Sequence, residues 1–236
     1  ITTIIALPNT DPVIDDVAGV EFIARRARKV GLAKVFAYGA VSKGIEGGEI
    51  TEMGLLHQAG AVAFCDGVKT IASARLLRQA LSYSTFFDGM IVQHPEEPEL
   101  SRGASMNSGE LATRLGLSGV SPLAEVMQIE RDLRLVEMTG GRLHFAHIST
   151  GESVEVIRKA KKRGLKVTCD TAPFYFALNE NAVSDYRTFA KLSPPLRSED
   201  DRQAIVAGLA DGTIDAIASD HNPQDVDSKR LPFAQA

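Results

Sequence analysis

The sequence predicts an α/β fold in which parallel strands alternate with helices, as in a (β/α) barrel. Seven short apolar runs are rich in β-branched residues, and segments with helical periodicity separate them. Most of these runs are continuous rather than alternating, which is typical of parallel strands buried on both faces. Because strand and helix follow each other along the chain, the order indicates a parallel sheet or a (β/α) barrel.

The same patterns place each element. The expected strands lie at residues 2–7, 34–41, 61–66, 90–94, 142–148, 166–172 and 215–221. The expected helices lie at roughly 16–30, 48–58, 70–82, 122–138, 151–163 and 199–210. Several helix ends carry signals, since Ser198 precedes an acidic first turn, Pro122 lies at a helix start, and Gly164 follows a basic helix end.

Two polar stretches interrupt the strand and helix order. Residues 95–121 and 173–198 each follow an expected strand and show no clear periodicity. Long excursions of this kind are where barrel enzymes place their substrate loops. Because no internal repeat or low-complexity tract divides the chain, we expect one domain with elaborated loops.

Composition narrows the classes of function. A 44% share of hydrophobic residues is enough for a large core, so we expect a globular protein. The formal net charge of −4 argues against nucleic-acid binding, and we expect the basic residues of 158–163 at a solvated helix end. Neither a membrane span nor a signal peptide is indicated, so the cytoplasm is the expected location. Cys65 and Cys169 are expected to be separate buried thiols.

Four titratable residues lie at or near the C-terminal ends of expected strands: Asp66, His94, His147 and Asp220. Barrel enzymes hold their chemistry at this face. A lone strand-end histidine is more often structural, but four strands offering His or Asp at the same end favour a shared site. Imidazole and carboxylate together suit divalent metals such as zinc, so the pattern predicts a metal-assisted hydrolase. His144 would face the opposite side of its strand from His147.

Six stretches also resemble a known family. They read ALPNTDPVID (6–15), AFCDG (63–67), QHPEEPEL (93–100), AHISTGESVEVIRKAK (146–161), PPLRSEDDR (194–202) and ASDHNPQ (218–224). Together they are similar to the bacterial type I dihydroorotases of the amidohydrolase superfamily. The resemblance implies a (β/α)8 TIM-like barrel that holds one or two zinc ions. It also implies the interconversion of N-carbamoyl-L-aspartate and L-dihydroorotate in pyrimidine biosynthesis.

The resemblance assigns roles to individual residues. It makes His94 and His147 ligands of one zinc ion and Asp66 the carboxylate that bridges two ions. It makes Asp220 a ligand of the other zinc and the group that shuttles the proton. The resemblance also makes Asn9, in the PNT motif, and Ser193 substrate-binding residues. Ser193 stands before PPLR, at a position where the family usually has Asn.

The sequence departs from the family pattern in ways that leave alternatives open. The His-x-His-x-Arg motif of the family's first strand is missing, and the chain ends at LPFAQA, where the family continues with a further loop, so the resemblance implies truncation at both ends. We therefore expect residues 1–236 to form a single partial (β/α) barrel catalytic domain with seven of eight strands, from which metal can be absent. The segment APFYF (172–176) and Gln224 stand where many relatives have histidines. One alternative is a catalytically silent homologue that partners aspartate transcarbamoylase, and another is a sister amidase such as allantoinase or dihydropyrimidinase. Self-association into a homo-oligomer is also left open.

Overall fold

The computed structural model describes residues 1–236, which fold into helices and short parallel strands. The residues cluster into two compact units. Unit 1 comprises Ile1–His94, Arg131–His144 and Gly164–Val167. Unit 2 comprises Pro95–Glu130, Phe145–Arg163 and Thr168–Ala236. The expectation of a single catalytic domain stays a prediction.

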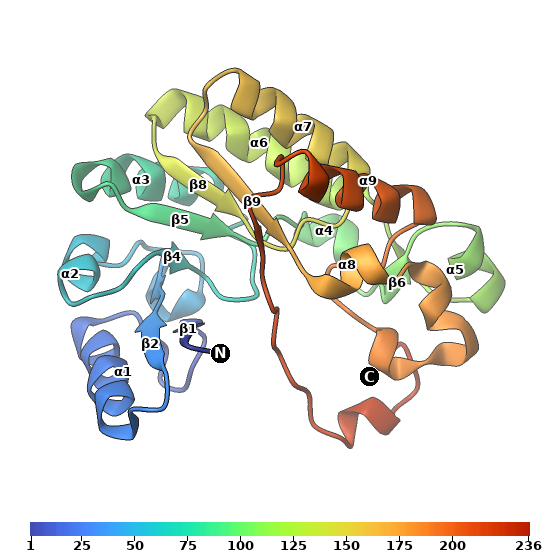
Figure 1. Ribbon diagram of the computed structural model, residues 1–236, viewed down its shortest axis with the longest axis horizontal. Coiled ribbons are helices and arrows are strands. Elements are labelled where there is room, and N and C mark those ends of the chain that lie inside the picture. Colours follow the sequence, from blue (N-terminus) through green and yellow to red (C-terminus); the bar gives the residue numbers. More distant parts are fainter. The chain divides into compact units, whose positions relative to one another are not determined.

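Unit 1 contains the first four of the expected strands and their helices (Figure 1). Its strands are β1 (Thr3–Ala6), β2 (Lys34–Ala37), β3 (Gly39–Ala40), β4 (Phe64–Cys65), β5 (Met90–Gln93) and the start of β8 (Arg142–Phe145). Its helices are α1 (Val17–Val30), η1 (Lys43–Ile45), α2 (Met53–Gln58), α3 (Ala74–Ser84), η2 (Thr85–Phe87) and the later turns of α6 (Leu123–Thr139). Strands β1 and β2 form a parallel pair, and the other strands lie in the order β8-β5-β4-β3.

Local sequence explains where the helices of unit 1 begin and end. Asp16 caps the start of α1 by accepting a hydrogen bond from the backbone N–H of Gly19, and Gly31 ends the helix with φ +67°. Ser73 caps α3 in the same way through the N–H of Leu76. The expected helix at 48–58 begins only at Met53, because the backbone N–H and the hydroxyl of Thr51 bond the carbonyls of Val41 and Ala40 instead.

Unit 2 contains the remaining expected strands. They are the end of β8, all of β9 (Val167–Thr171) but its first residue, and β10 (Ala216–Ile217), in the order β10-β9-β8. Its main helices are the start of α6, α7 (Gly151–Lys162) and α9 (Glu199–Ala210). Helices α7 and α9 pack against each other, and Gly208 of α9 permits this because a Cβ there would lie 2.9 Å from Val154. The predicted start signal of α9 is confirmed, because the Ser198 side chain accepts a hydrogen bond from the N–H of Asp201.

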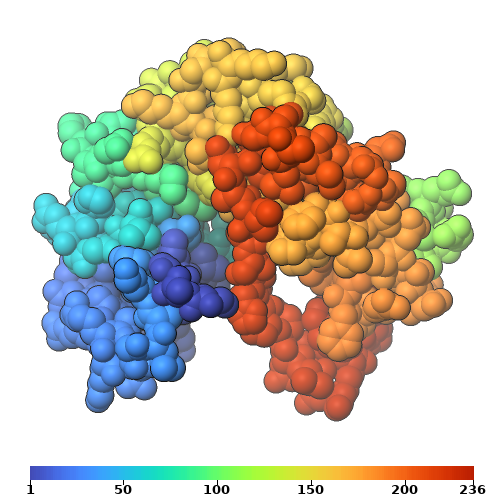
Figure 2. Space-filling model, viewed as in Figure 1, coloured from blue at the N-terminus to red at the C-terminus, as the bar shows by residue number.

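The two polar excursions are more structured than the sequence indicated. Residues 95–121 form α4 (Pro98–Ser101), β6 (Met106–Asn107), α5 (Glu110–Leu115) and β7 (Gly119–Val120), with β6 and β7 paired in parallel. Residues 173–198 form α8 (Pro173–Ala177), η3 (Glu180–Tyr186) and η4 (Thr188–Ala190), and η5 (Ser228–Arg230) lies beside η4 (Figure 2). These segments share one buried apolar cluster of Met106, Leu111, Ala112, Ala172, Tyr175, Val183, Ala190, Leu196 and Phe233. The prediction of plain substrate loops was therefore incomplete.

The seven expected strands are all present, and the pairs with a determined register are parallel. Strands β4 and β5, for which antiparallel pairing would have contradicted a barrel, pair in parallel through Phe64 and Ile91. The expectation that the strands are buried on both faces is wrong for β1 and β10. Side chains of both strands lie in solvent, among them Ile4 of β1 and Ile217 of β10.

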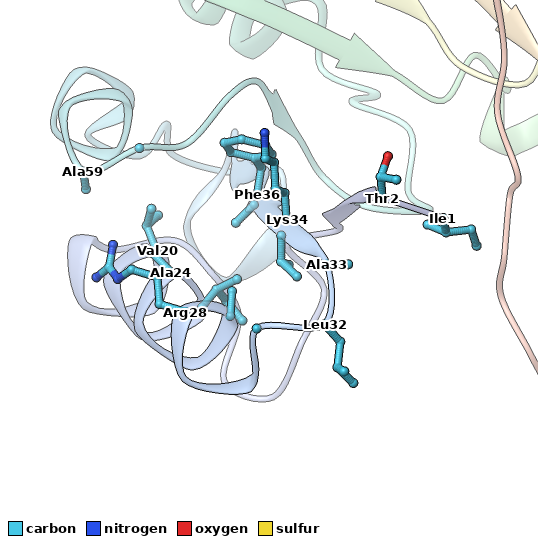
Figure 3. A pocket seen from close by; sticks show the side chains of 16 residues that line it. Ile1, Thr2, Val20, Ala24, Arg28, Leu32, Ala33, Lys34, Phe36 and Ala59 are labelled. Carbon is cyan, nitrogen blue, oxygen red and sulfur yellow. The ribbon is translucent and has the colours of Figure 1, made fainter.

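Unit 1 also has a pocket away from the strand ends that carry the titratable residues. It lies between α1, β2 and the turn after α2, and its walls include Val20, Ala24, Phe36 and Ala59 (Figure 3). Two positively charged residues, Arg28 and Lys34, also line the pocket. None of the candidate site residues lines this pocket. Separately, none of the helices combines the length and apolar character needed to cross a bilayer.

Candidate active site

His147 and Asp220, both in unit 2, face each other. His147 lies two residues beyond the end of β8, and Asp220 lies three residues beyond the end of β10. The imidazole Nε2 of His147 is 3.5 Å from Oδ1 of Asp220. Both side chains are about one-fifth exposed, so a small molecule can reach them. The structure therefore brings together two of the four strand-end residues within one unit.

The backbone at both positions is unusual. His147 has φ +58° and Asp220 has φ +43°, in the left-handed region that non-glycine residues rarely adopt. Such conformations persist only where the surrounding structure over-determines them, and they cluster at active sites. Because β8 ends at Phe145, the left-handed turn at His147, rather than strand alternation, sets the direction of its side chain.

Asp170, near the end of β9, is a site residue that the sequence analysis missed. Its Oδ1 accepts a hydrogen bond of 2.7 Å from the backbone N–H of His147 and lies 2.9 Å from the imidazole Nδ1. The Nδ1 contact is close, but its geometry is not that of an aligned hydrogen bond. Burial alone would lower the pKa of His147, but the carboxylates of Asp170 and Asp220 outweigh it and raise this pKa above its usual value.

A second buried carboxylate holds the segment that follows His147. Glu125, in the first turn of α6, is 1% exposed and accepts hydrogen bonds from the backbone N–H groups of Ser149 and Thr150. It also accepts from the hydroxyls of both residues. Arg197, buried beside it, donates from Nε to the Ser149 hydroxyl. No strand-end signal could have found Glu125, because it lies on a helix.

Asp66 follows β4 in unit 1, as predicted, and its carboxylate is already well bonded. Oδ1 accepts from the backbone N–H groups of Val41 and Ser42 at 3.0 and 2.9 Å, and Oδ2 accepts from the Ser42 hydroxyl at 2.6 Å. Burial raises the pKa of Asp66, although these hydrogen bonds oppose the shift. Asp66 therefore also has a structural role, because it ties the loop after β3 to the end of β4.

His94 and Asn9 complete the candidate residues of unit 1. His94 is buried at 8% exposure and directly follows β5. Its neighbour Gln93 uses its side-chain amide to bond both the N–H and the carbonyl of Ile71. Asn9 is exposed and lies against Gly67, where a Cβ would come within 2.9 Å of the Asn9 side chain. Gly67, at φ +67°, thus permits the close approach of Asn9 to the residue after Asp66.

Ser193, the other candidate for substrate contact, is an exposed residue of unit 2. The next residue, Pro194, is buried, and its carbonyl accepts a 2.7 Å hydrogen bond from the hydroxyl of Tyr175. Complete burial raises the pKa of Tyr175 well above its usual value, so this hydroxyl stays protonated and acts as a donor. Tyr175 belongs to the APFYF segment in which the sequence departs from the family pattern.

Two donors of unit 2 are spaced as two ligands of one zinc ion would be. Two ligands of a tetrahedral zinc at their usual bond lengths lie about 3.3–3.5 Å apart, which matches the 3.5 Å between Nε2 of His147 and Oδ1 of Asp220. A carboxylate beside the other ring nitrogen, as Asp170 provides, is the usual support of a metal-binding histidine. Neither unit by itself gathers three or more His, Cys, Asp or Glu side chains in a geometry that could hold a metal.

Solved structures share this fold. An L-hydantoinase (dihydropyrimidinase) from Arthrobacter aurescens matches with a TM-score of 0.76 and 24% identity, over 98% of this chain and 52% of its own. A dihydroorotase from Saccharomyces cerevisiae, in complex with 5-fluoroorotic acid, matches with a TM-score of 0.75 and 14% identity, over 98% and 65% of the two chains. The chain is therefore an α/β protein with part of a TIM-type barrel, as the sequence predicted.

Sequence comparison gives the family. The family described as dihydro-orotase-like matches residues 1–153. A dihydroorotase of Acetivibrio thermocellus is 47% identical over 232 residues, which is 98% of this chain and 54% of the relative. A dihydroorotase of Desulforapulum autotrophicum is 44% identical over 235 residues, which is 100% and 55% of the two chains. The chain thus spans about half the length of these relatives, and it belongs to the dihydro-orotase-like family.

Proposed function

We propose that the protein is a zinc-dependent dihydroorotase that interconverts N-carbamoyl-L-aspartate and L-dihydroorotate in pyrimidine biosynthesis, with the cytoplasm as its expected location. The observation that carries this proposal is the facing pair of His147 and Asp220, held in left-handed backbone conformations, in a member of the dihydro-orotase-like family. A scaffold protein without catalytic function has no need of a strained carboxylate that faces a supported imidazole.

We assign the zinc-binding role to Asp66, His94, His147 and Asp220, for one ion or two. The predicted strand-end pattern supports this assignment for all four residues, and the spacing of Nε2 and Oδ1 supports it for His147 and Asp220. When bound, zinc supplies a Lewis acid that activates water at neutral pH and polarises a carbonyl group.

The residues of the chain supply the remaining steps. In hydrolysis, the oxygen of water adds to the ring amide carbonyl of dihydroorotate, and the carbon–nitrogen bond breaks. Asp220 takes the proton from the attacking water and delivers it to the leaving ring nitrogen, so that no net proton remains on the carboxylate. Asn9 holds the substrate carboxylate, and Ser193, next to the Pro194 that Tyr175 bonds, also contacts the substrate.

The test is an assay of the protein expressed from its complete reading frame and supplied with zinc. We expect it to hydrolyse L-dihydroorotate, and to close N-carbamoyl-L-aspartate in the reverse direction. Turnover of allantoin or hydantoin instead would support a sister amidase. A folded, zinc-loaded protein that turns over none of these substrates, but co-purifies with aspartate transcarbamoylase, would support the silent partner.

A further inference from the structure

Five consecutive backbone N–H groups, from His147 to Gly151, are all bonded within unit 2. The side chain of Asp170 accepts a hydrogen bond from the N–H of His147. The backbone carbonyl of Asp170 accepts another from the N–H of Ile148, at 3.0 Å. The Glu125 carboxylate accepts hydrogen bonds from the N–H groups of Ser149 and Thr150, both at 3.1 Å. The side chain of Asp201, in α9, accepts from the N–H of Gly151 at 2.9 Å. No backbone donor in this segment is left to solvent, so the path of the chain after β8 is fixed residue by residue.

Glu125 is the group with the most contacts to this segment. Both of its oxygens lie 3.1 Å from the N–H of Ser149, and the hydroxyls of Ser149 and Thr150 donate to it at 2.5 and 3.0 Å. The Thr150 side chain also caps α7 by accepting from the N–H of Ser153. Glu125 therefore ties together the turn after His147 and the start of the next helix, from a position on α6.

Arg197 lies beside this carboxylate and links one of its partners, Ser149, to neighbouring segments. Its Nε donates to the Ser149 hydroxyl at 3.0 Å, and its Nη1 donates to the side chain of Asn107 and to the carbonyl of Val120. Its Nη2 lies 3.9 Å from Glu125. Arginine and glutamate are each less than 5% exposed, so a positive charge accompanies the buried carboxylate.

These contacts bear directly on His147. A residue at φ +58° returns to an ordinary conformation unless the chain on both sides of it is held. Asp170 holds the N–H of His147 itself, and Glu125 holds the chain two and three residues further on. We propose that Glu125 is a positioning residue for His147, which fixes the left-handed turn and so directs Nε2 toward Asp220. The expectation that this positioning also affects zinc binding rests on the proposed function.

The substitution Glu125→Gln tests whether Glu125 acts through its hydrogen bonds or only by filling space. A carboxylate offers two acceptor oxygens to the two N–H groups and two hydroxyls that meet here, whereas a side-chain amide offers one oxygen and an NH2 group. In Glu125→Gln the amide NH2 group replaces one of the two acceptor oxygens, so at least one of the N–H or hydroxyl donors loses its acceptor. The shape of the side chain is otherwise conserved.

The experiment follows the imidazole of His147 by NMR in the metal-free protein expressed from its complete reading frame. Long-range proton–nitrogen correlation spectra report the tautomer and environment of each histidine, and the His147 signals are assigned by their loss in His147→Gln. In Glu125→Gln we expect these signals to shift by more than their linewidth or to broaden by exchange. We also expect the zinc dissociation constant, from competition with a chromophoric chelator, to rise about tenfold or more.

Asp132→Asn is the matched control. Asp132 is a fully buried carboxylate two turns further along the same helix, where it bonds Gln93 and Arg131 instead of the segment after His147. We expect it to lower the unfolding midpoint as Glu125→Gln does, but to leave the His147 signals in place. If Glu125→Gln does not fold, Glu125→Asp is measured instead, with a smaller shift expected in the same direction.

The positioning role is overturned if the His147 signals are unchanged in the Glu125 variant, or if Asp132→Asn moves these signals equally. The proposed function fails separately. If the wild-type protein hydrolyses no dihydroorotate while Glu125→Gln still displaces the His147 signals and weakens zinc binding, the positioning role stands without that activity.

Discussion

His147 and Asp220 lie with Nε2 and Oδ1 3.5 Å apart, and each has a left-handed backbone. Left-handed conformations at non-glycine residues cost on the order of 1–3 kcal/mol each. Packing alone does not account for two such residues at the ends of different strands, because both side chains are partly exposed. The geometry instead suits two side chains that act together on a bound ligand.

The first prediction concerns Asp220. The substitution Asp220→Asn keeps the size of the side chain but removes the group that accepts the proton. We expect turnover of dihydroorotate to fall on the order of 10²-fold or more, as for loss of a general base. Because Asp220 is partly exposed and its one ion-pair contact is long, the unfolding midpoint should stay close to that of the wild type.

A matched carboxylate serves as its control. Asp227 lies in the same C-terminal segment, is highly exposed, and pairs only with Arg230 on the surface. We expect Asp227→Asn to leave turnover within about twofold, because an exposed pair of this kind contributes little. Equal losses in the two variants would contradict a specific role for Asp220.

The second prediction compares two tyrosines that both donate a hydrogen bond to a backbone carbonyl. Tyr175 is 3% exposed and bonds Pro194, whereas Tyr186 is 49% exposed and bonds Leu115. We expect Tyr175→Phe to lower the free energy of unfolding by about 1–2 kcal/mol, because it leaves a buried acceptor without a partner. Tyr186→Phe should cost less than about 0.5 kcal/mol, because water can replace the lost donor. Urea unfolding of both variants measures the difference.

The sequence predicted the seven strands from their continuous apolar runs and the six helices from their helical periodicity, although α2 is shorter than expected. It missed the structure of the excursions for a physical reason. Met106, Tyr175 and Phe233 belong to one apolar cluster but lie far apart along the chain, so no local period shows that they pack together. The short pair of β6 and β7 likewise depends on contacts that form only in three dimensions.

The candidate site was partly predictable as well. Asp170 lies one residue before the end of β9, so the strand-end rule that selected Asp66 could have selected it. It was hidden because the expected strand ran on to Ala172, and Asp170 then fell inside it. Glu125 gave no such signal, because an acidic residue in the first turn of a helix is ordinarily explained by the helix dipole alone.

The third prediction concerns the two free cysteines. Burial raises the pKa of the Cys65 thiol and that of the Cys169 thiol to about 12. At pH 8 only about one molecule in 10⁴ then carries a thiolate at either position, compared with roughly a quarter for an exposed cysteine. We expect neither thiol to react with a disulfide reagent in the native protein, and both to react in urea. Rapid native labelling of either residue, located by mass spectrometry, would contradict the burial of that thiol.

The last prediction concerns acid stability and Asp211, the residue that ends α9. Hydrogen bonds from Thr213, with help from Arg158, lower the pKa of Asp211 to about 2 from the 3.8 expected in the unfolded chain. Because the folded pKa is the lower one, the contribution of Asp211 to stability is fully present above pH 4. It is lost as the pH falls through about 2, since the unfolded chain takes up the proton first. Asp211→Asn cannot titrate, so it should be less stable than the wild type at pH 6 and nearly equal to it near pH 2. Urea midpoints measured between pH 6 and pH 2 test this, and a wild-type advantage that grows in acid would show that the sign of the shift is wrong.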